Sequence, residues 1–322
     1  MNSRILEPGQ IQTLAQRSIP RIRLPDRATL FAQRAARFDA LAAASSIGAY
    51  LHLQAAVARA QHAALADFPG ALPTPAQRSA AQAHRMPPMP AAAWPRAPQW
   101  RDALTAIGRA VAGLADCPDP VARLGERVAA LPADEAEAQA DRLLGVRDGA
   151  VDTAAAPLLM AALQVHWVAA ASRLVADEVR PLDVPGLCPL CGTPPVASIV
   201  RAQAPYRGYR YLHCALCACE WHQVRVQCSQ CGASGKDVAY RSLVPDEDSG
   251  ESAGALDQAV RAETCEQCHS YRKIVYQEKD PDVDPVADDL ASLALDLLLA
   301  EHGYARASGH PMLWQAETDG AR

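Results

Sequence analysis

The hydrophobic and polar pattern of the first 180 residues predicts a series of helices joined by proline-rich turns. Prolines are too dense between Pro69 and Pro98 for a regular helix, so this stretch is expected to be a connector. Abundant alanine favours helix over sheet here. The expected helices are Thr29–Ala43, Ile47–Leu65, Arg101–Leu114, Val121–Leu131, Ala133–Leu144 and Pro157–Ala176.

One apolar run, Ala154–Ala176, is the best candidate for a membrane span. Gln164, His166 and Arg173 interrupt it, and alanine is only weakly hydrophobic, so the run is expected to be a buried helix. The N-terminus shows no apolar stretch of the signal-peptide type. We therefore expect a soluble, cytoplasmic protein with no integral membrane segment.

The pattern changes at Arg180-Pro181, where alanine thins out and tyrosine, valine and cysteine appear. Short β-branched and aromatic runs bounded by turn residues predict strands. An acidic, Gly/Ser-rich stretch, Asp246–Gly254, is expected to be a solvated loop. The expected strands are Val196–Arg201, Tyr209–His213, His222–Val226, Val238–Leu243 and Tyr271–Tyr276.

A final helix is predicted over Pro285–His302, with Asp284 as N-cap and Gly303 ending it. Apolar residues form one stripe along this helix, and acidic residues lie on its other face. The acidic face is expected to be solvated, with a docking surface for a basic partner as the alternative. The stripe is Val286, Leu290, Leu293 and Leu297, and the acidic residues are Asp288, Asp289 and Asp296.

Candidate chemistry is concentrated in the cysteines, because nine of the ten fall between Cys188 and Cys268. In a cytosolic chain, paired cysteines indicate metal or redox chemistry rather than disulfides. Two intervening residues let both thiolates of a turn face one ion, and a tetrahedral site needs two such turns. Four pairs therefore predict two sites, formed by Cys188 and Cys191, Cys214 and Cys217, Cys228 and Cys231, and Cys265 and Cys268.

The simplest arrangement groups the pairs in sequence order, although spacing alone leaves an interleaved arrangement open. Gly192 and Gly232 follow two of the pairs, where a turn needs positive φ. Four thiolates suit iron or zinc, and they leave no open position for substrate, so we expect no catalysis. Cys219 breaks the pattern; it is expected to be a spare thiol on a strand, with a ligand role as the alternative.

These elements predict an α+β fold: an N-terminal all-α domain, two small rubredoxin- or zinc-ribbon-like β modules, and a C-terminal helix. The expected boundaries are 1–180 for the helical domain, 181–226 and 227–280 for the two metal modules, and 281–322 for the helix and tail.

Five stretches of the C-terminal half carry a family resemblance: Tyr211–Cys217, Glu220–Arg225, Ala262–Cys268, Tyr276–Pro281 and Val286–Leu293. They resemble the formate dehydrogenase accessory protein family FdhE. The likeness runs from Cys188 almost to the C-terminus, and the N-terminal half is similar more loosely, through Pro20–Pro25 and the helices that follow. Cys219 stands where the family is expected to have another residue.

The resemblance implies a cytoplasmic maturation factor for respiratory formate dehydrogenases, acting on their molybdenum- or tungsten-containing catalytic subunit before export. It also implies rubredoxin-like binding of two metal ions, with iron favoured over zinc, through the eight paired cysteines. The alternative function is a rubredoxin-like redox or electron-transfer protein.

Two other function classes are disfavoured by the residues themselves. Between Pro181 and Tyr276, nine basic residues face ten acidic ones, so no basic surface for nucleic acid is expected. The chain lacks the Gly-x-Ser-x-Gly, P-loop and dinucleotide-binding motifs of common enzymes. We therefore expect neither a nucleic-acid partner nor an enzyme.

Overall fold

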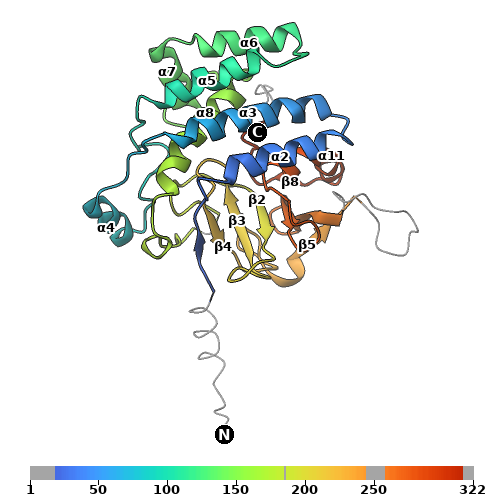
Figure 1. Cartoon of the computed structure of the whole chain (residues 1–322). Helices are drawn as coiled ribbons and strands as arrows, with labels where there is room; N and C mark the ends of the chain where they lie inside the picture. Colours follow the sequence, from blue (N-terminus) through green and yellow to red (C-terminus); the bar gives the residue numbers. More distant parts are fainter. Residues whose placement is uncertain (1–18, 185, 244–257, 315–322) are drawn as a thin grey trace, which may run out of the picture.

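The computed structural model describes residues 19–184, 186–243 and 258–314. The predicted loop Asp246–Gly254 lies outside these ranges. Figure 1 shows most helices of the N-terminal region stacked over one end of a β-sheet, with α4 out to one side and α5, α6 and α7 farthest from the strands. The helices of this region are α2 (Leu30–Ala42), α3 (Gly48–Ala66), α4 (Pro75–Ala83), α5 (Trp100–Ala112), α6 (Asp119–Ala129), α7 (Ala133–Leu143) and α8 (Ala156–Ala171), followed by a short 3-10 helix, Ala176–Glu178.

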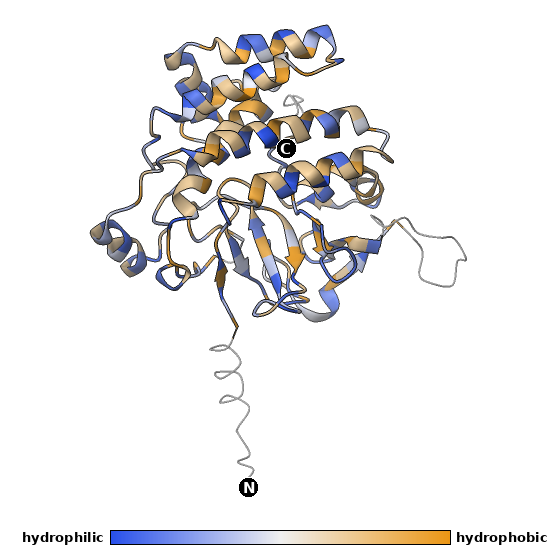
Figure 2. Cartoon of the chain, viewed as in Figure 1, coloured by the Kyte–Doolittle hydropathy of each residue, from blue (hydrophilic) through white to orange (hydrophobic). Residues whose placement is uncertain are grey.

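Helix α8 is the centre of the helical region, and nearly all of its residues are buried. A helix that is apolar all round must pack on every side, and α8 packs against α3, α5 and α7. By contrast, Figure 2 shows polar and apolar residues alternating around α6, the pattern of a helix with one side in solvent. Within the described ranges, no helix combines the length and the hydropathy that crossing a bilayer requires.

The expectation that Pro69–Pro98 holds no regular helix is wrong, because α4 lies inside it. Its prolines permit a helix between them: Pro75 occupies the first turn, where a missing N–H costs nothing, and the next proline is Pro87. Thr74 and Gln77 exchange side-chain-to-backbone hydrogen bonds of 3.2 and 2.8 Å, which form a capping box.

The described strands of both expected modules form one continuous sheet, in the order β1-β4-β3-β2-β7-β6-β5, with β8 beside β7. Neighbouring strands are antiparallel within each module, and the parallel pair β2–β7 joins the two modules. The strands are β1 (Ile22–Arg23), β2 (Pro195–Val200), β3 (Arg210–Cys214), β4 (Glu220–His222), β5 (Val238–Arg241), β6 (Val260–Cys265), β7 (Ser270–Tyr276) and β8 (Ala305–Arg306).

Two strand predictions need correction. The expected strand His222–Val226 begins earlier, at Glu220, and ends at His222, because the chain then turns away and leaves Val224 and Val226 exposed. Strand β6 was not predicted at all. It buries Glu263 and Thr264, so its pattern lacks the polar–apolar alternation that marks a half-buried strand.

The prediction of a single C-terminal helix is also wrong. The segment is broken at Ser292 into α10 (Ala287–Ala291) and α11 (Leu293–Glu301). Lys273 Nζ donates to the carbonyls of Asp289 and Ser292 at 2.8 and 2.9 Å. A cation bonded to these two carbonyls at the break favours ending one helix and starting another there. The predicted start at Pro285 is also wrong, because α10 begins at Ala287 with Val286 as its N-cap. The Asp284 carboxylate nevertheless accepts from the N–H groups of Val286 and Ala287, just before and at this start.

The expectation that the acidic face of this segment is solvated is wrong. Asp288 and Asp289 are completely buried. Asp288 is paired with Arg37 of α2 at 2.5 Å, and Asp289 with Arg306 of β8. The predicted stripe is instead partly in solvent, since Leu297 is 69% exposed. The α+β class with a helical N-terminal region and cysteine-rich C-terminal modules is nevertheless confirmed.

Candidate metal centres

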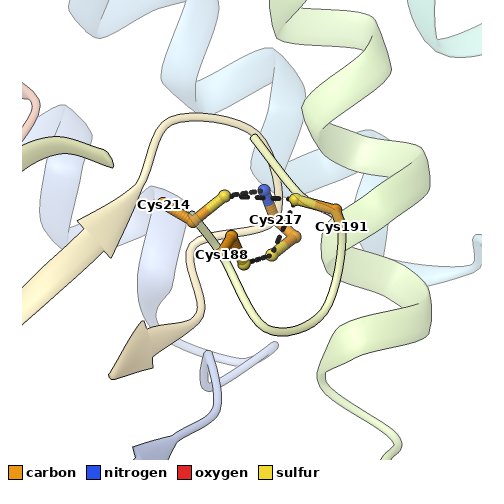
Figure 3. A group of neighbouring side chains, drawn as sticks. All are labelled: Cys188, Cys191, Cys214 and Cys217. Carbon is orange, nitrogen blue, oxygen red and sulfur yellow. Dashed lines mark hydrogen bonds between the residues drawn. The ribbon is translucent and has the colours of Figure 1, made fainter. Parts of the chain in front are cut away.

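Four cysteines from two separate turns meet beneath the helical region. Cys188 and Cys191 lie in the turn before β2, whereas Cys214 is the last residue of β3 and Cys217 lies in the loop that follows it. Their sulfur atoms point toward one another (Figure 3), with Sγ–Sγ distances of 3.5 Å for 188–217, 3.3 Å for 191–214 and 3.7 Å for 191–217. A disulfide would need about 2.05 Å, whereas a tetrahedron of thiolates around zinc has edges of about 3.8 Å.

The other four paired cysteines form a second group, contributed by the turn before β5, the end of β6 and the turn that follows β6. Cys228 lies 3.7 Å from Cys268, and Cys231 lies 3.6 Å from Cys265, measured between sulfur atoms. In each group all four sulfur atoms lie within 4.8 Å of one another. The structure therefore groups the four pairs in sequence order, and the interleaved arrangement is not seen.

The backbone explains why each pair turns its two sulfur atoms inward. The N–H of Gly192 donates to Cys188 O at 2.8 Å, and that of Gly232 donates to Cys228 O at 3.0 Å. Both glycines have positive φ, as the sequence predicted. The residues after the other two pairs, Ala218 and His269, also have positive φ, 55° and 50°, although they are not glycines. All four turns thus have the same left-handed exit, which is uncommon outside glycine.

The first cluster is bound to the helical region by hydrogen bonds and by hydrophobic packing. Gln164 of α8 donates to the carbonyl of Ala215 at 2.7 Å, between two of the cysteines. The N–H groups of Met89 and Ala91 donate to the carbonyls of Leu190 and Cys191 at 3.0 and 2.8 Å. All four cysteines of the first cluster belong to the largest hydrophobic core of the molecule, together with residues of α3, α5 and α8.

The second cluster is much more open. Cys231 is exposed and Cys268 is half-buried, and the apolar cluster around them contains only a few residues. The two sites therefore differ in one physical respect: the first is sealed by the helices, and the second reaches the surface.

Burial makes the first cluster suited to a cation. It raises the pKa of the Cys188, Cys214 and Cys217 thiols well above their ordinary value. Several thiolates cannot share one buried space without a positive charge among them, and a metal ion supplies that charge. The donor set, four sulfurs at tetrahedral spacing, fits iron or zinc.

Comparisons with known proteins cover almost the whole described chain. The family model for the FdhE N-terminal domain matches residues 19–183, that for the FdhE central domain matches 187–225, and that for the FdhE C-terminal domain matches 226–313. The chain belongs to the FdhE family.

Relatives within the FdhE family match along nearly their full length. The chain is 37% identical to "Protein FdhE homolog" of Cronobacter sakazakii, over 98% of this chain and 99% of that protein. It is 36% identical to "Protein FdhE" of Escherichia coli K12, with the same coverage. The crystal structure of the FdhE protein from Pseudomonas aeruginosa superposes with a TM-score of 0.77 at 37% identity, covering 92% of this chain and 100% of that one.

In this FdhE-family chain, the two remaining cysteines and two nearby histidines lie outside the two sulfur clusters. Cys219 is buried next to the first cluster, with its sulfur 3.8 Å from Glu220 O, and Cys117 is half-buried elsewhere. His213 contacts Glu220, and His222 contacts Arg21, so both have partners other than the clusters.

Sequence reasoning missed two hydroxyl groups that contact the clusters. Thr193 Oγ1 lies 3.3 Å from Cys191 Sγ, and Ser270 Oγ lies 3.0 Å from Cys268 Sγ. Each stands two residues after the second cysteine of its pair, which is the signal that could have found them. Such neighbours orient ligands and tune a metal site.

Proposed function

We propose that this chain is a non-catalytic accessory protein that binds the catalytic subunit of a respiratory formate dehydrogenase in the cytoplasm, during its maturation and before export. Membership of the FdhE family is the observation that carries this proposal, since full-length relatives bear that name. The two sulfur clusters support a metal-stabilised platform for a partner rather than an active site.

The eight paired cysteines are the proposed ligands of two metal ions, with iron favoured over zinc through the likeness to rubredoxin. Four protein ligands per ion leave no open coordination position for a substrate or an activated water. The proposed ligands are Cys188, Cys191, Cys214 and Cys217 for the first ion, and Cys228, Cys231, Cys265 and Cys268 for the second. The proposed domains are those stated above, 1–180, 181–226, 227–280 and 281–322.

Co-purification tests the proposed partner. Tagged protein isolated anaerobically from cells that express a respiratory formate dehydrogenase is expected to retain the catalytic subunit, identified by mass spectrometry. The matched control is a tagged cytoplasmic protein of similar charge. Folded, fully metallated protein that recovers no more catalytic subunit than this control would contradict the proposal.

A second function, electron transfer, is favoured by one observation: the second cluster reaches the surface through Cys231. If iron occupies the sites, anaerobically purified protein is expected to hold about two metal ions per chain and to show iron–thiolate charge-transfer absorption. Electron transfer further requires that this absorption bleaches reversibly on one-electron reduction. Zinc as the native metal would exclude electron transfer and leave the accessory function standing.

A further inference from the structure

A cleft of about 640 Å³ lies next to the first sulfur cluster but contains none of its cysteines. It is formed by α2, the N-terminal strand β1, the β3–β4 hairpin and the segment before α10, and its lining spans residues 23–40, 201–220 and 277–285. These stretches belong to all three family domains. None of the eight proposed ligands lines the cleft, so it needs an explanation of its own.

The floor of the cleft is rigid. His213 and Glu220 face each other across β3 and β4. Cys214 follows His213 as the last residue of β3, and Cys217 lies in the loop between the two strands. The Glu220 carboxylate is buried; His213 Nδ1 lies 3.0 Å from it, and Arg201 binds it through two nitrogens. The floor is thus built directly on one of the cysteine turns of the first cluster.

The arginines in and behind the wall of the cleft are already neutralised. Arg23, Arg34, Arg37 and Arg201 contact four carboxylates of the chain itself, those of Glu220, Asp280, Asp284 and Asp288. Arg34, for example, donates to Asp284 at 3.0 Å, and Arg37 lies 2.7 Å from Asp280. Four cations are therefore balanced by four anions, so this network offers no spare positive charge to an anionic ligand.

Two further carboxylates in the lining are not balanced. Asp26 and Asp282 are both exposed, and neither forms an ion pair with any residue that the structure describes. Asp26 accepts hydrogen bonds from the N–H of Ala28 and the hydroxyl of Thr29, both neutral groups. The open side of the cleft therefore carries a net negative charge.

We propose that this cleft binds a short, extended peptide segment that carries arginine or lysine, presented by the partner protein. The exposed amides of Gln33 and Gln203 offer donors and acceptors for a peptide backbone, while Asp26 and Asp282 select cationic side chains. The volume is in the range of sites that enclose a small ligand or a few residues. The inference rests on the proposed function for the identity of the partner, but not for the chemistry of the site.

Peptide binding measures that chemistry directly. By fluorescence anisotropy at low salt, a labelled (Arg-Ser)4 peptide is expected to bind and a labelled (Glu-Ser)4 peptide is not, and added salt should weaken binding. The variant Asp26→Asn/Asp282→Asn should bind the basic peptide about tenfold more weakly. The asparagine oxygen can still accept from the Ala28 N–H, and its NH2 can donate to the Thr29 hydroxyl in place of the bond that Asp26 accepts, so the turn before α2 is preserved.

The matched control is Asp119→Asn/Asp134→Asn, which removes two exposed carboxylates from α6 and α7, far from the cleft. It should bind like the unaltered protein. Equal binding of the basic and acidic peptides, no binding of the basic peptide, or unchanged binding by Asp26→Asn/Asp282→Asn would each overturn the proposal.

The same variants separate this proposal from the one on which it rests. If the unaltered protein retains the formate dehydrogenase catalytic subunit and Asp26→Asn/Asp282→Asn does too, the cleft proposal fails and the accessory function stands. If the unaltered protein binds the basic peptide but never the catalytic subunit, the accessory function fails and the cleft remains a site for basic peptides. Loss of the subunit in Asp26→Asn/Asp282→Asn alone supports both.

Discussion

Serine in place of both Cys188 and Cys214 is expected to abolish the cooperative unfolding transition of the protein. Each turn of the first cluster then loses one ligand, and the remaining thiols cannot hold a tetrahedral ion. A structural metal of this type contributes about 10–16 kcal/mol, which is folding free energy because the site does not exist in the unfolded chain. Whole domains are stable by only about 5–15 kcal/mol.

The position of the first cluster explains why the effect should be global. Its cysteines belong to the same hydrophobic core as α8, and hydrogen bonds from Gln164, Met89 and Ala91 fix its two turns. Losing the ion would leave serine hydroxyls and thiols in an apolar space. The measurement is thermal unfolding followed by circular dichroism, together with metal analysis of the soluble fraction.

The second cluster provides the matched comparison, because Cys228→Ser/Cys265→Ser makes the same chemical change at the surface site. That variant is expected to keep a cooperative transition and to lose one metal ion, since only a small apolar cluster surrounds these cysteines. Cys117→Ser should change neither quantity. A Cys188→Ser/Cys214→Ser protein that melts within about 5 °C of the unaltered chain would show that the first ion is not structural.

The sulfur clusters could be predicted from sequence because a metal-binding turn is a local structure. Two residues between cysteines fix the turn, and Gly192 and Gly232 mark two of its exits. The other two turns end at Ala218 and His269, whose residue types do not predict positive φ. Their left-handed conformation is imposed by the turn rather than favoured by the residue. The buried helix α8 was equally predictable, because its apolar pattern needs no knowledge of its neighbours.

What sequence could not supply depends on contacts between distant segments. The acidic face at Asp288 and Asp289 looks solvated until Arg37 and Arg306 are placed against it. Strand β6 was missed for the same reason, since Glu263 is a buried residue only because Arg210 reaches it from β3. The joining of both modules into one sheet rests on the parallel pairing of β2 with β7, which no local pattern encodes.

Arg210→Met is expected to lower the free energy of unfolding by about 3–5 kcal/mol, the usual result of removing one partner of a buried ion pair. Arg210 is completely buried in β3 and donates to Glu263 of β6 at 2.8 Å. It also donates to the carbonyls of Val224 and Gln227 at 3.3 and 2.9 Å. Without it, a buried carboxylate and two carbonyls lose their partner.

Urea unfolding of the metallated protein measures this loss, and Arg225→Met, at an exposed position close in sequence, is the matched control. Adding Glu263→Gln to Arg210→Met should recover part of the stability, because it removes the uncompensated charge. A loss below about 1 kcal/mol, within the range of an exposed ion pair, would contradict the role given to Arg210.

The same variant tests whether the two modules act as one body. Gln227 precedes Cys228, so a bond from Arg210 to the Gln227 carbonyl ties β3 to the first turn of the second cluster. Arg210→Met should therefore also weaken metal retention at the second site, measured as faster release of one ion to a chelator. If the modules were independent, stability would fall while this release stayed unchanged. The continuous sheet predicts that both change together, because one buried guanidinium bridges the two halves.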